Sequence, residues 1–378
     1  MKKLLFLLIL LFIPFSVFAE ELIPNSVSGI LMEAGSGKII FEKEKDKEVS
    51  VASLTKMVAQ IIILEEVEKG NIKWNDIVTV SKNAASMGGS QIYLSEGEKI
   101  TVEDLMKGIS VASGNDATVA MAEYISGSEE KFVKKMNKKV KELGLKHTHF
   151  INCTGLDEEG HFSSAYDIAM IAKELINNHK DILNFSSIYE DYLREDTDNK
   201  FWLVNTNKLI SQYDGADGLK TGHTDDAGYC LAATTKRGDL RLIAIVLGEE
   251  DSKTRNSETI ELLDYGFNNV KLRKLKDKEN SIKRIKLNKA DKEYMDVYLK
   301  DNLNVVEDID SKNKYNYEVE VKDINLPIKK GDILGNIFVK NKDKVVTTGK
   351  LISDKDVSRL SLIDLFKNNI INIITGNI

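Results

Sequence analysis

The spacing of apolar residues changes several times along the first 270 residues, and each change predicts a different kind of element. Alternating apolar positions over 28–32 and 38–41, joined by a Gly-Ser-Gly turn, predict a β-hairpin. An apolar helical stretch runs from about Ser53 to Glu68 and stops before Gly70. Helical spacing also covers 102–106, 116–125, 129–143, 165–177 and 257–267, whereas strand-like segments cover 229–235 and 241–247. This order of elements indicates one sheet flanked by helices.

The pattern after residue 270 is different. Residues 271–292 are dense in charge, and the short β-branched segments that follow alternate between apolar and polar positions. These segments span 294–299, 315–321, 333–339 and 345–350, with turn residues between them. We therefore expect a separate small all-β domain at 271–356, following a larger domain at 20–270.

The N-terminus carries an export pattern. Lys2 and Lys3 precede an unbroken apolar run at 4–13 and a small-residue pattern that ends at Ala19, which is typical of a cleaved signal peptide at 1–19. The apolar run is too short for a membrane span of ~20 residues, although an uncleaved anchor is the alternative. The pattern predicts a protein that works outside the cytoplasm.

At the other end, apolar residues recur at helical spacing within 357–378. They are Leu362, Ile363, Phe366, Ile370, Ile373 and Ile374. This spacing predicts an amphipathic helix that lies in a membrane interface but is too polar to cross the membrane. A terminal helix that packs on its own domain is the alternative.

Composition narrows the classes of function. The 53 basic and 59 acidic residues give a net charge of −6, which argues against a general electrostatic grip on nucleic acid. Two cysteines, Cys153 and Cys230, can form neither a disulfide framework nor a four-thiolate zinc site. The histidines at 147, 149, 161 and 179 form no helical i, i+4 pair, so we expect no metal and no cofactor.

The first candidate for chemistry is Ser53-Leu54-Thr55-Lys56, at the start of the long apolar helix. Residues three apart share a helix face, so the Lys56 amine can reach the Ser53 hydroxyl. A buried amine with a lowered pKa can take the serine proton, and a helix N-terminus favours the negative charge that develops. Taken alone, the pattern is more often an N-cap serine followed by a solvated lysine.

Two further motifs lie downstream. Ser113-Gly114-Asn115 fits a tight loop between two helices that aims a hydroxyl and an amide into a cleft, or else an ordinary N-cap turn. Lys220-Thr221-Gly222 precedes the predicted strands at 229–247. A glycine in a strand indicates a close approach, here by a ligand backbone or carbonyl, and Lys220 and Thr221 are then placed to hold a carboxylate. A polar edge strand is the alternative.

The order Ser-x-x-Lys, Ser-x-Asn, Lys-Thr-Gly in an exported chain resembles that of penicillin-binding proteins and class A β-lactamases. The stretches at 86–94, 113–128, 154–175 and 218–248 closely resemble the exported D-alanyl-D-alanine carboxypeptidases, and the resemblance covers about 22–267. It implies an α/β (α+β) catalytic domain of the β-lactamase/transpeptidase type, with a mixed helical block around an antiparallel sheet. It continues more loosely through the β-rich domain and into the tail, which those enzymes typically use as a membrane anchor.

The resemblance also implies roles for individual residues. Ser53 is expected to be the acylated nucleophile and Lys56 its general base. Ser113 is expected to relay protons with Lys220, and Asn115 to orient the amide backbone of the substrate.

The third motif and the chain after it supply the expected substrate contacts. The backbone N–H of His223 is expected to complete an oxyanion hole with that of Ser53, next to Gly222. Thr221 and Arg255, the latter from a looser local match, are expected to bind the carboxylate of the leaving D-alanine. The His223 imidazole itself is a poor candidate for a base.

The implied activity is that of a serine-type carboxypeptidase at the outer face of the cytoplasmic membrane. Its expected partners are peptidoglycan stem peptides ending in D-Ala-D-Ala, β-lactam antibiotics as covalent inhibitors, and a membrane surface through the C-terminal helix. A β-lactamase is the nearest rival, but the glutamate it would need, Glu174, lies inside an unbroken helical pattern. A transpeptidase, a DD-endopeptidase or a non-enzymatic β-lactam sensor could be built on the same scaffold.

Overall fold

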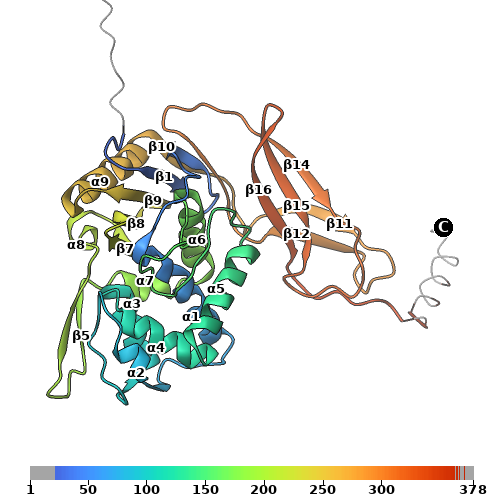
Figure 1. Ribbon diagram of the computed structural model, residues 1–378. Helices are drawn as coiled ribbons and strands as arrows, with labels where there is room; N and C mark the ends of the chain where they lie inside the picture. The colour runs from blue at the N-terminus through green and yellow to red at the C-terminus, as the bar shows by residue number, and fades with distance from the viewer. Residues whose placement is uncertain (1–21, 362, 365, 367–369, 371–378) are drawn as a thin grey trace, which may run out of the picture.

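The computed structural model describes residues 22–361 together with residues 363, 364, 366 and 370. The expected signal peptide at 1–19 lies outside the described residues, and so does most of the expected C-terminal helix. Figure 1 shows a larger body of helices around a sheet, followed by a smaller body of strands. The fold class predicted for these two parts is confirmed, whereas the terminal helix stays a prediction.

The larger body is organised around an antiparallel sheet of five strands in the order β2-β1-β9-β8-β7. Its strands are β1 (Ser28–Glu33), β2 (Ile39–Lys43), β7 (Ala216–Thr224), β8 (Gly228–Arg237) and β9 (Leu240–Glu249). The N-terminal β1 pairs with β9, so the sheet joins the two ends of this body. Because β7 is an edge strand, the backbone groups on its outer side are not paired within this sheet.

Side chains of β9 alternate between two hydrophobic cores on opposite faces of the sheet. Ile243 and Ile245 join the larger core with the helical block, whereas Leu242 and Ala244 join a smaller core with α9 (Ser252–Asn269). The block comprises α1 (Lys56–Glu68), α3 (Val102–Val111), α4 (Asn115–Ser126), α5 (Glu129–Glu142) and α6 (Ala165–Asn178). The predicted hairpin, helices and strands of this body are confirmed, although α3 and α9 are longer than predicted.

Shorter elements surround this framework, and the apolar pattern predicts none of them except η2, which overlaps the start of the helix predicted from Ser53. They are η2 (Ala52–Thr55), β3 (Ile77–Thr79), α2 (Lys82–Ala85), β4 (Lys99–Thr101), α7 (Ile182–Ser186), β5 (Glu190–Leu193), β6 (Phe201–Val204) and α8 (Leu209–Gln212). Strand β3 pairs with β4, and β5 pairs with β6, each as a separate two-stranded ribbon. Figure 1 shows the β5 hairpin extending from the body as an arm.

The smaller body is a second five-stranded antiparallel sheet, in the order β11-β12-β16-β15-β14. Its strands are β11 (Ser281–Lys286), β12 (Tyr294–Leu299), β14 (Asn316–Val321), β15 (Ile333–Asn341) and β16 (Lys344–Ser353). The apolar alternation predicts four of these. The charged segment at 271–292 forms β11 and most of β10 (Val270–Lys276), and neither strand is predicted. Only one side chain of each strand is fully buried, and most of the others are charged, so the apolar alternation of a strand is weak there.

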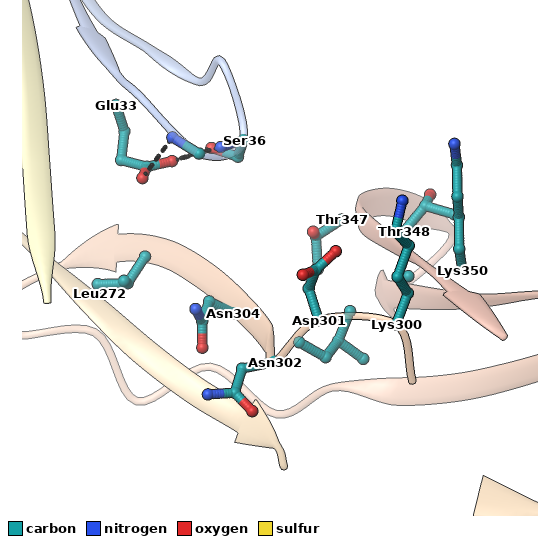
Figure 2. A pocket seen from close by; sticks show the side chains of 13 residues that line it. Glu33, Ser36, Leu272, Lys300, Asp301, Asn302, Asn304, Thr347, Thr348 and Lys350 are labelled. Atoms are coloured by element: carbon teal, nitrogen blue, oxygen red, sulfur yellow. Dashed lines mark hydrogen bonds between the residues drawn. The ribbon is translucent and has the colours of Figure 1, made fainter. Parts of the chain in front are cut away.

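A two-stranded ribbon joins the two bodies. It pairs β10 with β13 (Leu303–Asp308), and Val270 and Val306 enter the core beneath α9. Figure 2 shows the polar cleft beside this ribbon, with Glu33 and Ser36 on one wall and residues of the β-rich body opposite. At its far end the chain stays in the β-rich body past residue 356, because Val357 is buried there and bridges Ile328.

Candidate active site

The turn that carries Ser53 is compressed between two glycine-containing segments. Ala52 has a φ of +48°, which is uncommon for a residue with a side chain, and Ser53 follows it in η2 at the N-terminal end of α1. A Cβ on Gly155 would lie 1.9 Å from the Ala52 carbonyl oxygen, and one on Gly222 would lie 2.8 Å from that of Val51. The absence of a side chain at Gly222 therefore lets the turn that carries Ser53 pack directly against β7. The close approach that a glycine in this strand predicts is made by the Val51–Ser53 turn, and the approach of a ligand backbone to Gly222 stays a prediction.

Lys56 lies fully buried behind Ser53, and its three contacts define its chemistry. Its Nζ atom is 2.6 Å from Ser53 Oγ, 2.6 Å from Asn115 Oδ1 and 2.7 Å from the Thr154 carbonyl oxygen. The Asn115 amide is oriented because its Nδ2 donates to the Gly88 carbonyl at 2.7 Å. Two of the three neighbours of the Lys56 amine can therefore only accept hydrogen bonds.

The three oxygen neighbours accommodate either an ammonium, which donates to all three, or a neutral amine. In the neutral form, the two N–H groups are donated to Asn115 Oδ1 and to the Thr154 carbonyl, and the lone pair is directed to the hydroxyl of Ser53. Burial lowers the pKa of Lys56 to about 7, against partial opposition from Cys153 and Asp116. A substantial share of the amine is then unprotonated at neutral pH, as a general base requires.

The loop between α3 and α4 brings the second motif to the same point. Ser113 has a φ of +63°, and α4 begins at Asn115, one residue before the predicted start at 116. The Ser113 hydroxyl is buried and finds no hydrogen-bond partner among the described residues, although it lines the cleft. Asp116 fixes the opposite side of the loop, because its carboxylate accepts backbone N–H groups of Ile92 and Leu94. An orphan hydroxyl in a cleft is a group available to a substrate.

The third motif lies on β7, the edge strand. Lys220 is buried and donates to the Thr221 carbonyl at 2.9 Å; burial, followed by the nearby Lys56 charge, lowers its pKa well below the ordinary lysine value. Thr221 Oγ1 donates to Thr206 Oγ1 at 2.7 Å. His223 is exposed, and its ring packs on Tyr229 with centroids 4.0 Å apart, so the structure gives the imidazole no catalytic neighbour among the described residues.

Arg255, on α9, completes the cleft and has no acidic partner among the described residues. It is 5% exposed, and its Nη2 and Nε donate to Asn256 Oδ1 at 2.8 and 3.1 Å. Burial lowers the pKa of Arg255, yet a guanidinium remains charged at any ordinary pH. A buried cation without a carboxylate is costly unless a ligand supplies one.

The cleft of about 430 Å³ that these groups line contains most of the residues that the sequence singled out. Ser53, Ser113, Thr221, Gly222, His223 and Arg255 line it together with Ser90, Val204, Asn205, Thr206, Lys208, Tyr229, Ser252 and Asn256. Lys56, Lys220 and Asn115 lie buried directly behind these lining residues.

Sequence reasoning missed the residues that act through their backbone. Thr154 contributes only a carbonyl oxygen and Gly155 only its lack of a side chain, so neither has a side-chain signature. Thr206 was not singled out because its partner Thr221 is distant in sequence. The glutamate considered for a β-lactamase, Glu174, lies within α6 and accepts from Asn178 at 2.8 Å.

Comparison with known proteins agrees with this geometry. Residues 18–251 match the family model described as D-alanyl-D-alanine carboxypeptidase, and residues 271–359 match that of the C-terminal domain of penicillin-binding protein 5. The D-alanyl-D-alanine carboxypeptidase DacF of Bacillus subtilis is 44% identical over 353 residues, covering 92% of this chain and 90% of the relative. DacA of Escherichia coli K12 is 35% identical, covering 87% of this chain and 82% of the relative.

Solved structures show the same likeness in three dimensions. Penicillin-binding protein 5 from Haemophilus influenzae superposes with a TM-score of 0.74 at 30% identity, covering 89% of this chain and 98% of that one. Penicillin-binding protein D2 from Listeria monocytogenes, in its ampicillin-bound form, has a TM-score of 0.58 at 30% identity, covering 64% of this chain and 98% of that one.

Proposed function

Because the chain belongs to the D-alanyl-D-alanine carboxypeptidase family, we propose that it releases the terminal D-alanine of peptidoglycan stem peptides through an ester on Ser53. The family makes the protein a serine-type peptidase, and ligand-bound relatives make penicillin binding the expected form of inhibition. The individual residue roles that follow are supported by the contacts in the cleft.

Acylation begins at the contact between Ser53 and Lys56. The Lys56 lone pair takes the hydroxyl proton as Ser53 Oγ attacks the carbonyl carbon of the penultimate D-alanine, and the carbonyl oxygen becomes an oxyanion. The backbone N–H groups of Ser53 and His223, at the N-terminal end of α1 and on the edge strand β7, are the proposed donors to that oxyanion.

Collapse of the tetrahedral intermediate breaks the bond to the terminal D-alanine. The leaving nitrogen needs a proton, and the orphan Ser113 hydroxyl is the proposed donor. The proton that Lys56 took from Ser53 then reprotonates Ser113, directly or through Lys220, and Lys56 is neutral again. Water attacks the ester, Lys56 takes a proton from that water, and it passes this proton to Ser53 Oγ as the ester breaks. Asn115 holds the Lys56 amine and is the proposed contact to the substrate amide.

The terminal carboxylate of the substrate is assigned to Arg255 and Thr221. Arg255 is buried, positively charged and without an acidic partner among the described residues, and Thr221 lies on the same cleft. A substrate that ends in a free carboxylate satisfies the guanidinium. The single observation that carries the proposal is the buried amine of Lys56, which lies 2.6 Å from Ser53 Oγ and is held by two acceptors on its other sides.

The test is incubation of the purified protein with a pentapeptide that ends in D-Ala-D-Ala. We expect a tetrapeptide and one free D-alanine per turnover, and a β-lactam adduct on the peptide that contains Ser53. Ser53→Ala should abolish both, and Lys56→Ala should slow acylation by at least ~10²-fold. An adduct on any other serine, or unaltered turnover by Ser53→Ala, contradicts the assignment.

We further propose that the enzyme is exported and held at the membrane surface by its C-terminal segment. The export pattern at 1–19 and the apolar spacing within 357–378 support this. Of the apolar residues of that segment, Ile363 and Phe366 are each 68% exposed and Ile370 is 41% exposed. None of the described helices has the length and apolar character needed to cross a bilayer. Each side chain fully buried in lipid gains roughly 1.5–3 kcal/mol, so a few suffice for reversible attachment.

Vesicle flotation of the mature chain and of a chain ending after Ser361 tests the attachment. The cut is placed there because Val357 is buried in the β-rich body and Leu360 N–H donates to the Lys289 carbonyl at 2.9 Å. We expect loss of flotation with peptide hydrolysis and melting temperature unchanged. A full-length mature protein that does not float refutes the proposal, and a truncated one that melts earlier indicates a packing helix instead.

A further inference from the structure

The β5–β6 hairpin carries two neighbouring aromatic side chains in solvent. Tyr192 and Trp202 are directly opposite each other in the hairpin register, and they are 42% and 55% exposed. The Lys200 ammonium lies 3.8 Å from the centre of the Tyr192 ring. Cross-strand neighbours lie on the same face of a ribbon, so both rings are exposed on one face of the hairpin. We call this pair the aromatic platform.

The opposite face of the hairpin is firmly packed. Leu193 and Leu203, one position along from the platform residues, are 1% and 0% exposed. Asp191 on that face pairs with Lys107 of α3 at 3.1 Å. At the end of β5, Arg194 pairs with Glu98 at 2.6 Å. Burial on one side and exposure on the other give the alternation of a half-buried ribbon, so the platform has a fixed orientation.

The platform continues the wall of the active-site cleft. Val204 lines the cleft and lies two residues beyond Trp202 on β6, and therefore on the same face, roughly 7 Å away along the strand. Lys208, which also lines the cleft, lies 5.7 Å from the ring centre of Tyr189, just before β5. A polymer that leaves the cleft along β6 therefore meets the platform next.

We propose that the aromatic platform of Tyr192 and Trp202 binds a sugar ring of the glycan polymer that bears the stem peptides. One face of a pyranose ring presents C–H groups, and these stack on aromatic rings. The Lys200 ammonium lies over one face of the Tyr192 ring and pairs with Glu195 at 3.2 Å, so the stacking is assigned chiefly to Trp202. Glu190, on the same face of the ribbon, is placed for hydroxyl and amide groups of the sugar. Continuity with the cleft makes this a second contact for polymeric substrate, and in that respect the inference rests on the proposed function.

Other occupants fit the surface less well. Two side chains are a small fraction of the 1,200–2,000 Å² that a specific protein interface usually buries. The hairpin tip that follows carries Glu195, Asp196 and Asp198 against Lys200, and this acidic tip is repelled by the anionic lipids of a bacterial membrane. An uncharged saccharide is not repelled by the acidic tip.

Tryptophan fluorescence tests the platform without reference to activity. The probe is a soluble β-1,4-linked oligomer of N-acetylglucosamine that carries no peptide, added to the whole protein. The signal of Trp202 is the difference between the wild type and Trp202→Phe, since Trp74 is half-buried against Phe185. We expect a saturable change in the wild type that is absent in Trp202→Phe. Absence of any difference, or a response to anionic vesicles instead of the saccharide, overturns the proposal.

Kinetics on two substrates separates this inference from the proposed function. Tyr192→Ala and Trp202→Ala should raise KM about 3- to 10-fold for polymeric peptidoglycan and leave kcat/KM on a free pentapeptide unchanged. The matched control is Tyr294→Ala in the β-rich body, which is also 42% exposed and has Arg284 over its ring at 5.1 Å. Equal KM values on the polymer for all variants refute the platform. Saccharide binding without pentapeptide hydrolysis supports the platform and refutes the proposed function.

Discussion

The rate of acylation should depend on pH through the buried amine of Lys56. Desolvation lowers the pKa of Lys56 to about 7, and only the neutral amine can take the Ser53 proton. With that pKa, roughly half of the enzyme is competent at pH 7 and about a tenth at pH 6. With the ordinary lysine pKa of about 10.4, fewer than about one molecule in 2,000 would be competent at pH 7. Burial therefore raises the competent fraction at neutral pH by about three orders of magnitude.

The measurement is the second-order rate constant of acylation by a β-lactam, followed by mass spectrometry between pH 5.5 and pH 9. This constant refers to the free enzyme, so its acid limb reports the pKa of the free base. We expect a tenfold fall per pH unit below a midpoint near 7 and a plateau above it. Circular dichroism over the same range, and a β-lactam whose carboxylate stays ionised throughout, exclude unfolding and ligand titration.

A rate that is flat between pH 6 and pH 8 refutes this account of Lys56, and so does a midpoint near that of an exposed lysine. Lys220 is buried as well, and the Lys56 charge is one cause of its lowered pKa. The observed midpoint therefore belongs to the pair of amines and reports when the pair first gives up a proton. Lys56→Ala should remove the limb together with most of the rate.

Three further predictions concern other parts of the structure. Gly222→Ala places a Cβ 2.8 Å from the Val51 carbonyl oxygen, so β-lactam acylation should fall by about 10²-fold, measured well below the melting temperature of the variant. Arg255→Ala should chiefly raise KM for peptides with a free terminal carboxylate, and an unchanged KM removes Arg255 from the site. Burial, followed by the neighbouring Glu258, raises the pKa of Glu249 to about 8. The folded state then holds a proton that the unfolded state releases near pH 4.3, so this group's contribution to stability falls as pH rises from there to about 8. Glu249→Gln should raise the melting temperature at pH 8 and change it less at pH 5, and equal shifts at both pH values contradict this.

The helices of the larger body could be predicted because residues at their own N-termini determine where they begin. Thr101, Ser128 and Ser164 each accept a backbone N–H from three residues ahead, and each caps a helix that begins at the next residue. Such caps, followed by an amphipathic face, need no information from distant parts of the chain. The strands β10 and β11 have no such local signal, because the sequence of a surface strand with one buried side chain resembles that of a charged loop.

In the candidate site too, contacts set by local spacing could be predicted, whereas contacts set by tertiary packing could not. The contact between Lys56 and Ser53 follows from helical spacing alone, and the structure shows it at 2.6 Å. The Thr154 carbonyl, which accepts from the same amine, could not be predicted, because a backbone oxygen has no residue type and reaches the site only through tertiary packing. Gly222 shows the intermediate case: its need for a close approach was predicted, whereas the identity of its neighbour depended on how η2 packs on β7.

The distribution of charge in the cleft follows from which of its cations can lose a proton. Lys56, Lys220 and Arg255 all lie buried around one space, and none of them pairs with a carboxylate among the described residues. Burial lowers the pKa of each, but only the two amines can give up their proton and become neutral, because a guanidinium keeps its proton at any ordinary pH. The charge that persists is thus at Arg255, where a terminal carboxylate is proposed to bind. The anion of the substrate then pairs with the cation that cannot act as a base, and the amine beside Ser53 is left free to act as one.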